Sequence, residues 1–444
     1  LGVGEPRTYL VGAQSPAELR GSGGFIGAYA LMTARRGEIE LGPFRPIQSL
    51  APSRVRGVEP PNPDYARIYD PWGGAGLMHN INMTPDFPSA AVAMERLYAE
   101  VEGRSVDGVI VADPRGLAAL MEVTGRARVP GLGISLSARS LVPFLANEAY
   151  GRFRDPVTRK RVLGDVAGQV LKRFLSGAAR ARPAAAGRAL ADAASGGHLL
   201  LHSVDPEVQA AFLQAGVAGR LGGVGGADYL NVVVNNISVN KVDYFVERRV
   251  RYRVTLEEGG IAEGIADVRF DNHAPRRGQQ SYVIGPRPGV SGPGESVMIA
   301  TAYCAPSCRV TGFSRNGRSE PVSLEEELGH PLARVIAEVP SGGSETLSYR
   351  WQVDRAWHGT TGYGTYRLVF QGQPTIRPTE LEISVRAPEG MLITRTEPEM
   401  DVDGAVATWR GKPGDRAEFE VEFARPILGR LWHAVWDFLN HPVA

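Results

Sequence analysis

Cysteine is almost absent from this sequence of 444 residues, which contains only Cys304 and Cys308. No histidine lies near them, so the pattern does not favour a cysteine-based metal site. The spacing Cys-Ala-Pro-Ser-Cys favours a short disulfide loop of the kind found in exported proteins, with two free thiols as the alternative. No apolar run approaches the ~18 residues that span a bilayer, and no signal peptide is visible. The chain begins at Leu1 without a methionine, so we expect any export or anchor segment to lie outside this sequence.

Net charge is also lacking. The formal charge is only +1, so no overall field recruits nucleic acid or an anionic membrane, and we expect no nucleic-acid partner. Lysine is scarce, and nearly all basic residues are arginines, which bind phosphate and carboxylate groups through two parallel hydrogen bonds. A GC-rich genome explains the same bias.

The length and composition predict two globular domains. The chain is too long for one ordinary core, and its 43% hydrophobic and 22% charged residues are typical of folded proteins. Glycine (54 residues) and proline (32 residues) are abundant, which indicates many turns and loops.

Residues 1–242 alternate between strand and helix patterns, which predicts an α/β domain with a mixed sheet and flanking helices. The expected strands are 8–12, 25–33, 39–41, 106–111 and 229–234, the last closing the sheet, with a hairpin over 25–41 and a loop over 13–24. Helices are expected over 89–102, 113–123, 140–150 and 158–175, with a loose helix over 176–198. The segment 42–88 has almost no periodicity, and irregular segments of that length are usually functional.

Residues 243–427 alternate apolar and polar residues in short runs without helices, which predicts an all-β sandwich. The runs begin at Tyr244 and recur near 264–271, 296–302, 334–339, 345–352, 365–370, 379–385 and 417–423. The aromatic tail, 428–444, is expected to be helix-like and either to dock on the protein or to lie at a membrane surface.

The sequence has no P-loop, dinucleotide-binding fingerprint, zinc-hydrolase helix or nucleophile elbow. Two loop segments instead contain the candidate chemistry. Glu18 lies between two buried strands, and Asp86 directly precedes a helix, and open α/β sheets place their sites at such positions. A carboxylate pair supplies the acid and the nucleophile or base that glycoside chemistry needs. Alternatively, Glu18 forms a local ion pair and Asp86 caps the helix.

The same two segments offer residues for substrate binding. Asn80 and Asn82 suit sugar hydroxyls, and Arg20 suits an anionic group or tunes a carboxylate. Gly23 and Gly24 allow a sugar or another backbone to come close. His79 is the only histidine before His198, although a loop histidine is more often a surface residue than a base.

The segments Ala17-Glu18-Leu19-Arg20-Gly21-Ser22-Gly23-Gly24-Phe25-Ile26-Gly27 and Asn80-Ile81-Asn82-Met83-Thr84-Pro85-Asp86-Phe87-Pro88 resemble the signatures of a bacterial family known as domain of unknown function 4012. Asp228-Tyr229-Leu230, Asn235-Asn236 and Lys241-Val242-Asp243 fit the same family. The resemblance covers residues 8 to about 275.

That family more distantly resembles the LytR–CpsA–Psr enzymes, in residues 25–48, 82–114, 150–155 and 159–161. These enzymes transfer glycopolymers from a polyprenyl-pyrophosphate carrier to the cell wall, using Mg²⁺, arginines and a lipid-holding pocket. The resemblance implies a phosphate-binding role for Arg45, Arg152 and Arg154. This sequence also departs from the LytR–CpsA–Psr pattern. At the two positions where that family has its metal-binding aspartates, this sequence has Gly23-Gly24-Phe25-Ile26 and Phe44-Arg45-Pro46-Ile47. Without those aspartates phosphoryl transfer loses its usual electrostatic clamp.

Three hypotheses about function follow. The first is an extracytoplasmic hydrolase or transglycosylase that uses Glu18 and Asp86 on a cell-envelope glycan, such as an arabinan, given an actinobacterial-type composition. It needs no metal or other cofactor. The second is a Mg²⁺-dependent phosphoglycosyl transferase that takes glycopolymer from a polyprenyl-phosphate lipid. The third is a non-catalytic envelope protein that binds glycan or lipid.

Overall fold

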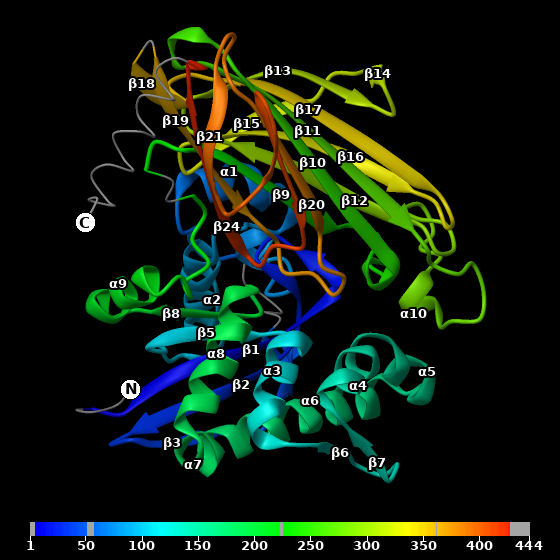
Figure 1. Ribbon diagram of the computed structural model, residues 1–444. Helices are drawn as coiled ribbons and strands as arrows, with labels where there is room; N and C mark the ends of the chain where they lie inside the picture. Colours follow the sequence, from blue (N-terminus) through cyan, green and yellow to red (C-terminus); the bar gives the residue numbers. More distant parts are fainter. Residues whose placement is uncertain (1–4, 51–56, 223–224, 361, 427–444) are drawn as a thin grey trace.

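The computed structural model describes residues 5–50, 57–222, 225–360 and 362–426. It shows a mixed α/β region in the N-terminal half and a C-terminal region built from β-sheets (Figure 1). The predicted division into these two classes of structure is therefore confirmed. The predicted tail, 428–444, lies outside the described residues.

The N-terminal sheet is six-stranded with the order β3-β2-β1-β5-β8, and β4 pairs with β2. The pairs β1–β2 and β5–β8 are antiparallel, and β1–β5 is parallel. Its strands are β1 (Arg7–Arg20), β2 (Gly23–Arg35), β3 (Glu38–Leu41), β4 (Arg45–Pro46), β5 (Gly108–Ala112) and β8 (Leu199–Ser203).

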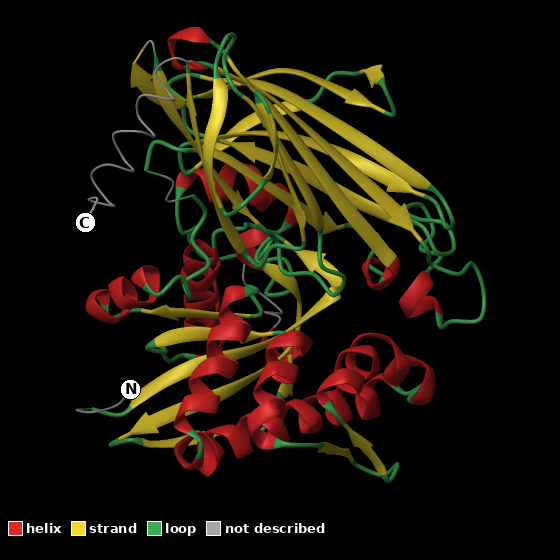
Figure 2. Ribbon diagram, in the orientation of Figure 1, coloured by secondary structure: helices red, strands yellow, loops and turns green. Residues whose placement is uncertain are grey.

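Helices gather mainly in this N-terminal region (Figure 2). One face of the sheet packs against α2, and the other face packs against the end of α6 and the turn that follows it. The helices are α1 (Pro63–Tyr69), α2 (Phe87–Glu102), α3 (Pro114–Thr124), α4 (Ala138–Pro143), α5 (Ala149–Arg152), α6 (Pro156–Arg173), α7 (Ala179–Ala181), α8 (Pro183–Ser195) and α9 (Pro206–Gln214). A small hairpin, β6 (Ala127–Val129) and β7 (Ile134–Leu136), follows α3.

The C-terminal region contains two eight-stranded sheets and is called the β domain below. The first has the order β15-β16-β12-β9-β19-β24-β21 with β18 paired to β19, and the second has the order β14-β13-β17-β11-β10-β20-β23-β22. The two sheets share one buried core, and the Tyr252 hydroxyl in the second sheet donates to the Asp228 carboxylate in the first at 2.7 Å.

The strands of the first sheet are β9 (Asp228–Asn236), β12 (Ser296–Cys304), β15 (Ser323–Glu327), β16 (His330–Val339), β18 (Trp357–Thr360), β19 (Tyr363–Gln371), β21 (Leu392–Glu397) and β24 (Arg416–Ala424). Those of the second are β10 (Val246–Leu256), β11 (Ala262–Asn272), β13 (Cys308–Arg315), β14 (Arg318–Ser319), β17 (Ser344–Val353), β20 (Glu380–Arg386), β22 (Asp401–Asp403) and β23 (Val406–Gly411). A short helix, α10 (Ser281–Ile284), lies between β11 and β12, and Cys304 and Cys308 form a disulfide between β12 and β13.

Two local predictions were wrong. The strand 229–234 does not close the N-terminal sheet, because β9 lies between β12 and β19 in the β domain. The segment 13–24 is not a loop, since β1 continues through irregular pairing to Arg20 and β2 starts at Gly23. The helix predicted over 140–150 is present within a continuous helical segment of residues 138–152, which contains a π-helical turn at Phe144–Glu148 directly after Pro143, whose missing N–H and ring disfavour regular helix.

Candidate functional site

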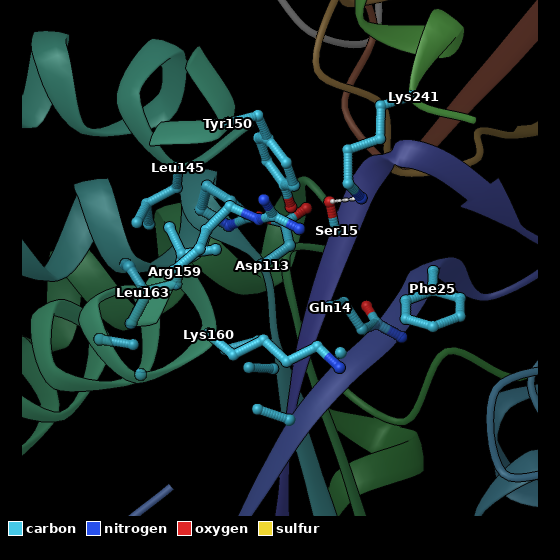
Figure 3. Close-up of a pocket in the computed structure, with 18 of the residues that line it drawn as sticks. Gln14, Ser15, Phe25, Asp113, Leu145, Tyr150, Arg159, Lys160, Leu163 and Lys241 are labelled. Carbon is cyan, nitrogen blue, oxygen red and sulfur yellow. Dashed lines mark hydrogen bonds between the residues drawn. The ribbon is translucent and has the colours of Figure 1, made fainter. Parts of the chain in front are cut away.

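A cavity of about 110 Å³ opens at the carboxyl end of the parallel pairing between β1 and β5, where Ala13 pairs with Ala112 and β1 continues beyond the pair. Such strand ends are where open α/β sheets usually bind ligands. The described residues that line it come from β1, β2, α3, α6 and neighbouring turns. The β-domain side adds Tyr282 and Lys241, the latter labelled in Figure 3. The cavity therefore lies in the α/β domain and is completed by residues from beyond it.

One wall of the cavity is apolar. Leu117, Leu145, Leu163 and Ala167 contribute it from α3, the π-helical turn and α6. A wall of this kind favours a hydrocarbon group, because apolar surface leaves water when such a group enters.

Three cationic side chains face the same cavity, namely Arg159, Lys160 and Lys241. Burial is the main cause that lowers the pKa of Lys160, and neighbouring Arg159 lowers it further. The Lys160 ammonium donates to the Gln48 side chain at 2.7 Å. Three cations beside an apolar wall suit an anionic group attached to a hydrocarbon.

Two tyrosines hold two of these cations. Tyr150 and Tyr282 stack with ring centroids 5.6 Å apart. Arg159 Cζ lies 4.8 Å from the centroid of the Tyr150 ring and 5.3 Å from that of Tyr282. Lys241 Nζ lies 5.1 Å and 5.5 Å from the same two centroids. Burial alone would lower the pKa of Lys241, but Tyr150, Tyr282 and Glu18 raise it above its ordinary value. Lys241 is therefore a fixed cation at this end of the cavity.

Asp113 is the only carboxylate among the described lining residues. Its Oδ1 accepts from the backbone N–H groups of Arg115 and Gly116, which caps α3, and its Oδ2 lies 2.6 Å from His198 Nδ1. Because both oxygens are engaged, the lining does not fit a Mg²⁺ site. Across the described ranges, no group of three or more histidine, cysteine, aspartate or glutamate side chains is arranged to hold a metal ion.

The structure places Glu18 and Arg20 near the end of β1, both almost completely buried. Glu18 lies 3.6 Å from Arg20 and 3.6 Å from Lys241. The Arg20 guanidinium donates to the carbonyls of Leu19 and Asn236 and, beyond them, to the His79 carbonyl and the Asn80 side chain. Burial lowers the pKa of Arg20. These contacts bind the end of β1 to its surroundings and leave neither residue in the cavity lining.

Asp86 caps α2, as the alternative interpretation predicts. Its Oδ2 accepts from the Ser89 N–H at 3.0 Å and from the Ser89 hydroxyl at 2.6 Å, and its Oδ1 accepts from the Leu221 N–H at 2.9 Å. Burial raises the pKa of Asp86. Among the described residues Glu18 and Asp86 share no hydrogen-bond or ion-pair partner, so the structure does not join them in one constellation.

The remaining residues predicted in these segments also make internal contacts. Asn82 is fully buried, and its amide donates to the Gly24 carbonyl at 2.9 Å. A Cβ on Gly24 would lie 2.3 Å from the Ser15 backbone, and Gly23 has a φ of +132°, so both glycines permit close backbone packing. His79 is half-buried, and burial lowers its pKa.

The arginines implied by the family resemblance lie apart from the cavity lining. Arg45, Arg152 and Arg154 are all exposed, and Arg152 forms an ion pair with Glu148 at 3.7 Å. The cationic residues that do line the cavity, Arg159, Lys160 and Lys241, were not predicted as site residues. The available signal was their position inside two resembling stretches, 159–161 and 241–243, although the sequence alone does not show which side chains turn inward.

Residues 4–150 match the sequence model of a family described as protein of unknown function, DUF4012. This match confirms the resemblance predicted from the two N-terminal motifs, and it ends before the motifs at 228–243. No curated protein matches the chain in sequence. Across the described residues, the helices are too short or too polar to cross a membrane.

Similar solved structures are distant. A proposed nutrient-binding protein from Legionella pneumophila is 10% identical over 48% of this chain and 76% of its own, with a TM-score of 0.29. Yeast LTA4 hydrolase is 12% identical over 44% of this chain and 33% of its own, with a TM-score of 0.27. An M1 zinc metallopeptidase from Deinococcus radiodurans is 10% identical over 40% of this chain and 42% of its own, with a TM-score of 0.23.

Proposed function

We propose that the α/β domain binds a lipid phosphate of the polyprenyl-phosphate class, and that the chain is an extracytoplasmic, lipid-binding protein of the cell envelope. The observation that supports this is the cavity, in which Arg159, Lys160 and Lys241 stand beside an apolar wall. Phosphate oxygens accept hydrogen bonds from such cations, and the wall covers the adjoining carbons.

The cavity volume limits how much of the ligand can be enclosed. A volume of about 110 Å³ holds a phosphate and the carbons next to it, but not a whole polyprenyl chain. A longer chain would continue out of the open mouth. We therefore expect a short analogue, farnesyl phosphate, to bind about as well as a full-length carrier lipid.

Two further observations support an envelope role. The disulfide between Cys304 and Cys308 suits an oxidising compartment. Arg159 and Lys160 belong to the stretch that resembles the LytR–CpsA–Psr enzymes. We propose for this chain a lipid pocket and a fold similar to those of that family. The described lining contains no free carboxylate that could bind Mg²⁺ for a transfer reaction. Hydrolysis by Glu18 and Asp86 stays a prediction. The geometry does not favour it, because both carboxylates already form ion pairs or hydrogen bonds with other residues.

Filling the cavity tests the proposal. Gly27 lines it, and a Cβ there would meet only the Phe25 ring, at 3.9 Å or more. A Gly27→Leu side chain therefore fills the space where the hydrocarbon is expected. Gly187→Leu is the matched control, because Gly187 is exposed on α8 with nothing within 4 Å of a Cβ.

The measurement is calorimetric titration of the full chain with farnesyl phosphate, farnesol and inorganic phosphate. We expect farnesyl phosphate to bind the unaltered protein and Gly187→Leu equally, farnesol to bind at least about tenfold more weakly, and Gly27→Leu to lose binding. Equal affinity for farnesol and farnesyl phosphate, or full binding by Gly27→Leu, overturns the proposal.

A further inference from the structure

The outward face of the second sheet in the β domain is lined by cations. A groove of about 640 Å³ crosses this face over β17, β11, β10, β20 and β23, which are neighbours in that order; the first four are labelled in the upper part of Figure 1. We call it the arginine groove. Its basic residues are Arg249, Arg251, Arg269, Arg410 and Lys412, and its acidic residues are Asp267, Glu380 and Glu382.

These side chains face outward because of strand alternation. In β10 the even-numbered residues from Val250 to Leu256 are buried in the core, so Arg249, Arg251 and Arg253 point away from it. The register then aligns Arg251 with Glu382 in β20 and Asp267 in β11. The groove is therefore a consequence of the sheet's pairing.

The cations are more accessible than most of the anions beneath them. The side chains of Arg251 and Arg410 are 56% and 66% exposed, whereas Glu382, the carboxylate that both contact at 3.0 Å, is only 25% exposed. Asp267 is 23% exposed. A guanidinium has five N–H donors, and one ion pair uses only part of them. The remaining donors of these arginines face solvent.

We propose that the arginine groove binds an acidic polysaccharide, one whose sugars bear carboxylate or phosphate groups. The five strands lie about 4.8 Å apart, so the groove extends for about 19 Å, which suits an extended polymer better than a single small anion. This inference does not rest on the lipid-phosphate proposal.

The composition of the groove favours a glycan over a nucleic acid. Sugar hydroxyls both donate and accept hydrogen bonds, and the groove alternates arginine donors with carboxylate acceptors and Thr346. Single-stranded nucleic acid is usually bound by stacking its bases on aromatic rings, and no described residue of this groove is aromatic. The same lack of rings disfavours a neutral glycan.

The test removes two arginines that share one carboxylate. Arg251→Gln/Arg410→Gln retains bulk and hydrogen bonding but deletes two charges over Glu382. The matched control is Arg367→Gln/Arg395→Gln. Arg367 and Arg395 are 47% and 60% exposed in the first sheet, and each also pairs with glutamate of β24, although they do not share one carboxylate.

Binding is measured on the full chain with fluorescently labelled polygalacturonate and phosphomannan, polysaccharides whose sugars bear carboxylate and phosphate groups respectively, which separate carboxylate from phosphate recognition. Dextran and a thymidine oligonucleotide serve as the neutral glycan and the nucleic acid. We expect at least one acidic polymer to bind, the double variant to weaken it about tenfold, and the control to change it less than twofold. Raising salt from roughly 50 to 200 mM should weaken binding strongly.

Circular dichroism and the melting temperature establish that both variants fold. The proposal is overturned if neither acidic polymer binds, if the two double variants weaken binding equally, or if the oligonucleotide or dextran binds as tightly as the acidic polymers. Farnesyl phosphate binding is expected to be unchanged in the groove variant, so failure here is distinguishable from failure of the lipid-phosphate proposal.

Discussion

The Lys241 ammonium lies 3.6 Å from the Glu18 carboxylate, and both side chains are almost completely buried. Lys241 also donates to the Ser15 hydroxyl at 3.3 Å and lines the cavity. Glu18 is at the end of β1, whereas Lys241 follows β9 of the β domain. This one ion pair therefore joins the two regions of the chain and fixes a cation in the candidate site.

Glu18→Gln should destabilise the protein substantially. The substitution leaves Lys241 and Arg20 buried without their carboxylate, and removing one partner of a buried pair typically costs about 3–5 kcal/mol. The measurement is the thermal unfolding midpoint, which we expect to fall by several degrees. Adding Lys241→Met to Glu18→Gln should restore part of the loss. A Glu18→Gln protein that melts like the unaltered chain contradicts the structural role assigned to this carboxylate.

Gly21→Ala should be far more disruptive than Gly27→Ala, although both glycines belong to the same motif. A Cβ on Gly21 would lie 2.0 Å from the Met83 carbonyl oxygen, which is backbone and has no rotamer to change, whereas a Cβ on Gly27 would make only ordinary contact with the Phe25 ring at 3.9 Å. We expect a loss of about 3 kcal/mol or more for Gly21→Ala and within about 0.5 kcal/mol for Gly27→Ala. Urea unfolding of both variants measures the difference, and similar midpoints would refute the close approach.

Glu327 should make stability depend on pH. Its carboxylate is buried at the contact between β15, α1 and the segment before α2, where it accepts from the hydroxyls of Tyr69, Tyr303 and Thr84 at 2.6–2.8 Å. Burial raises the pKa of Glu327 to about 7. The folded state therefore holds a proton that the unfolded chain releases at lower pH. Its stabilising contribution is complete below the ordinary glutamate pKa and is lost as pH rises through about 7.

The variant Glu327→Gln should flatten this dependence. We compare the free energy of unfolding of both proteins from pH 5 to pH 7.5, where a single group contributes up to about 1.4 kcal/mol per pH unit. Burial also raises the pKa of Asp228 and Asp243 to about 6, so the unaltered protein alone does not isolate Glu327. The difference between the two curves does, and parallel curves would show that Glu327 is not the responsible group.

Much of the local fold was predictable from the sequence. The hairpin of β2 and β3 follows from its apolar runs and turn, and Asp113-Pro114 marks the start of α3 because aspartate caps and proline favours the first helical turn. The alternating run predicted from Tyr244 onward is confirmed in β10, where Arg249, Arg251 and Arg253 are exposed while Arg248 is buried with the apolar face. The wholly buried β9 was assigned to the wrong sheet, because a continuous apolar run has the same pattern in any buried sheet.

The candidate site was much less predictable. Carboxylates in loops indicate chemistry only if their oxygens are free. Glu18 and Asp86 have near partners in Arg20 and Ser89, which the sequence suggests, but each also has a partner that is remote in sequence. Leu221, which binds Asp86, is 135 residues away. The aromatic and cationic end of the cavity combines Tyr150, Lys241 and Tyr282 from three separate segments. No local sequence pattern predicts that these three residues lie close together, because their proximity depends on how the β domain packs against the α/β domain.

Lys160 and Arg161 are neighbours in α6, but only Lys160 lines the cavity, whereas Arg161 is exposed. Lys160→Met should therefore weaken farnesyl phosphate binding about tenfold, because it removes one of three cations close to the phosphate, where a charge-assisted contact is worth roughly 1.5–3 kcal/mol. Arg161→Met removes the same formal charge at the surface, where solvent and salt screen it, and should change affinity less than twofold. Calorimetric titration of both variants distinguishes a specific phosphate contact from a general effect of charge. Equal losses would mean that the attraction is long-range, and no loss in either would place the phosphate away from Lys160.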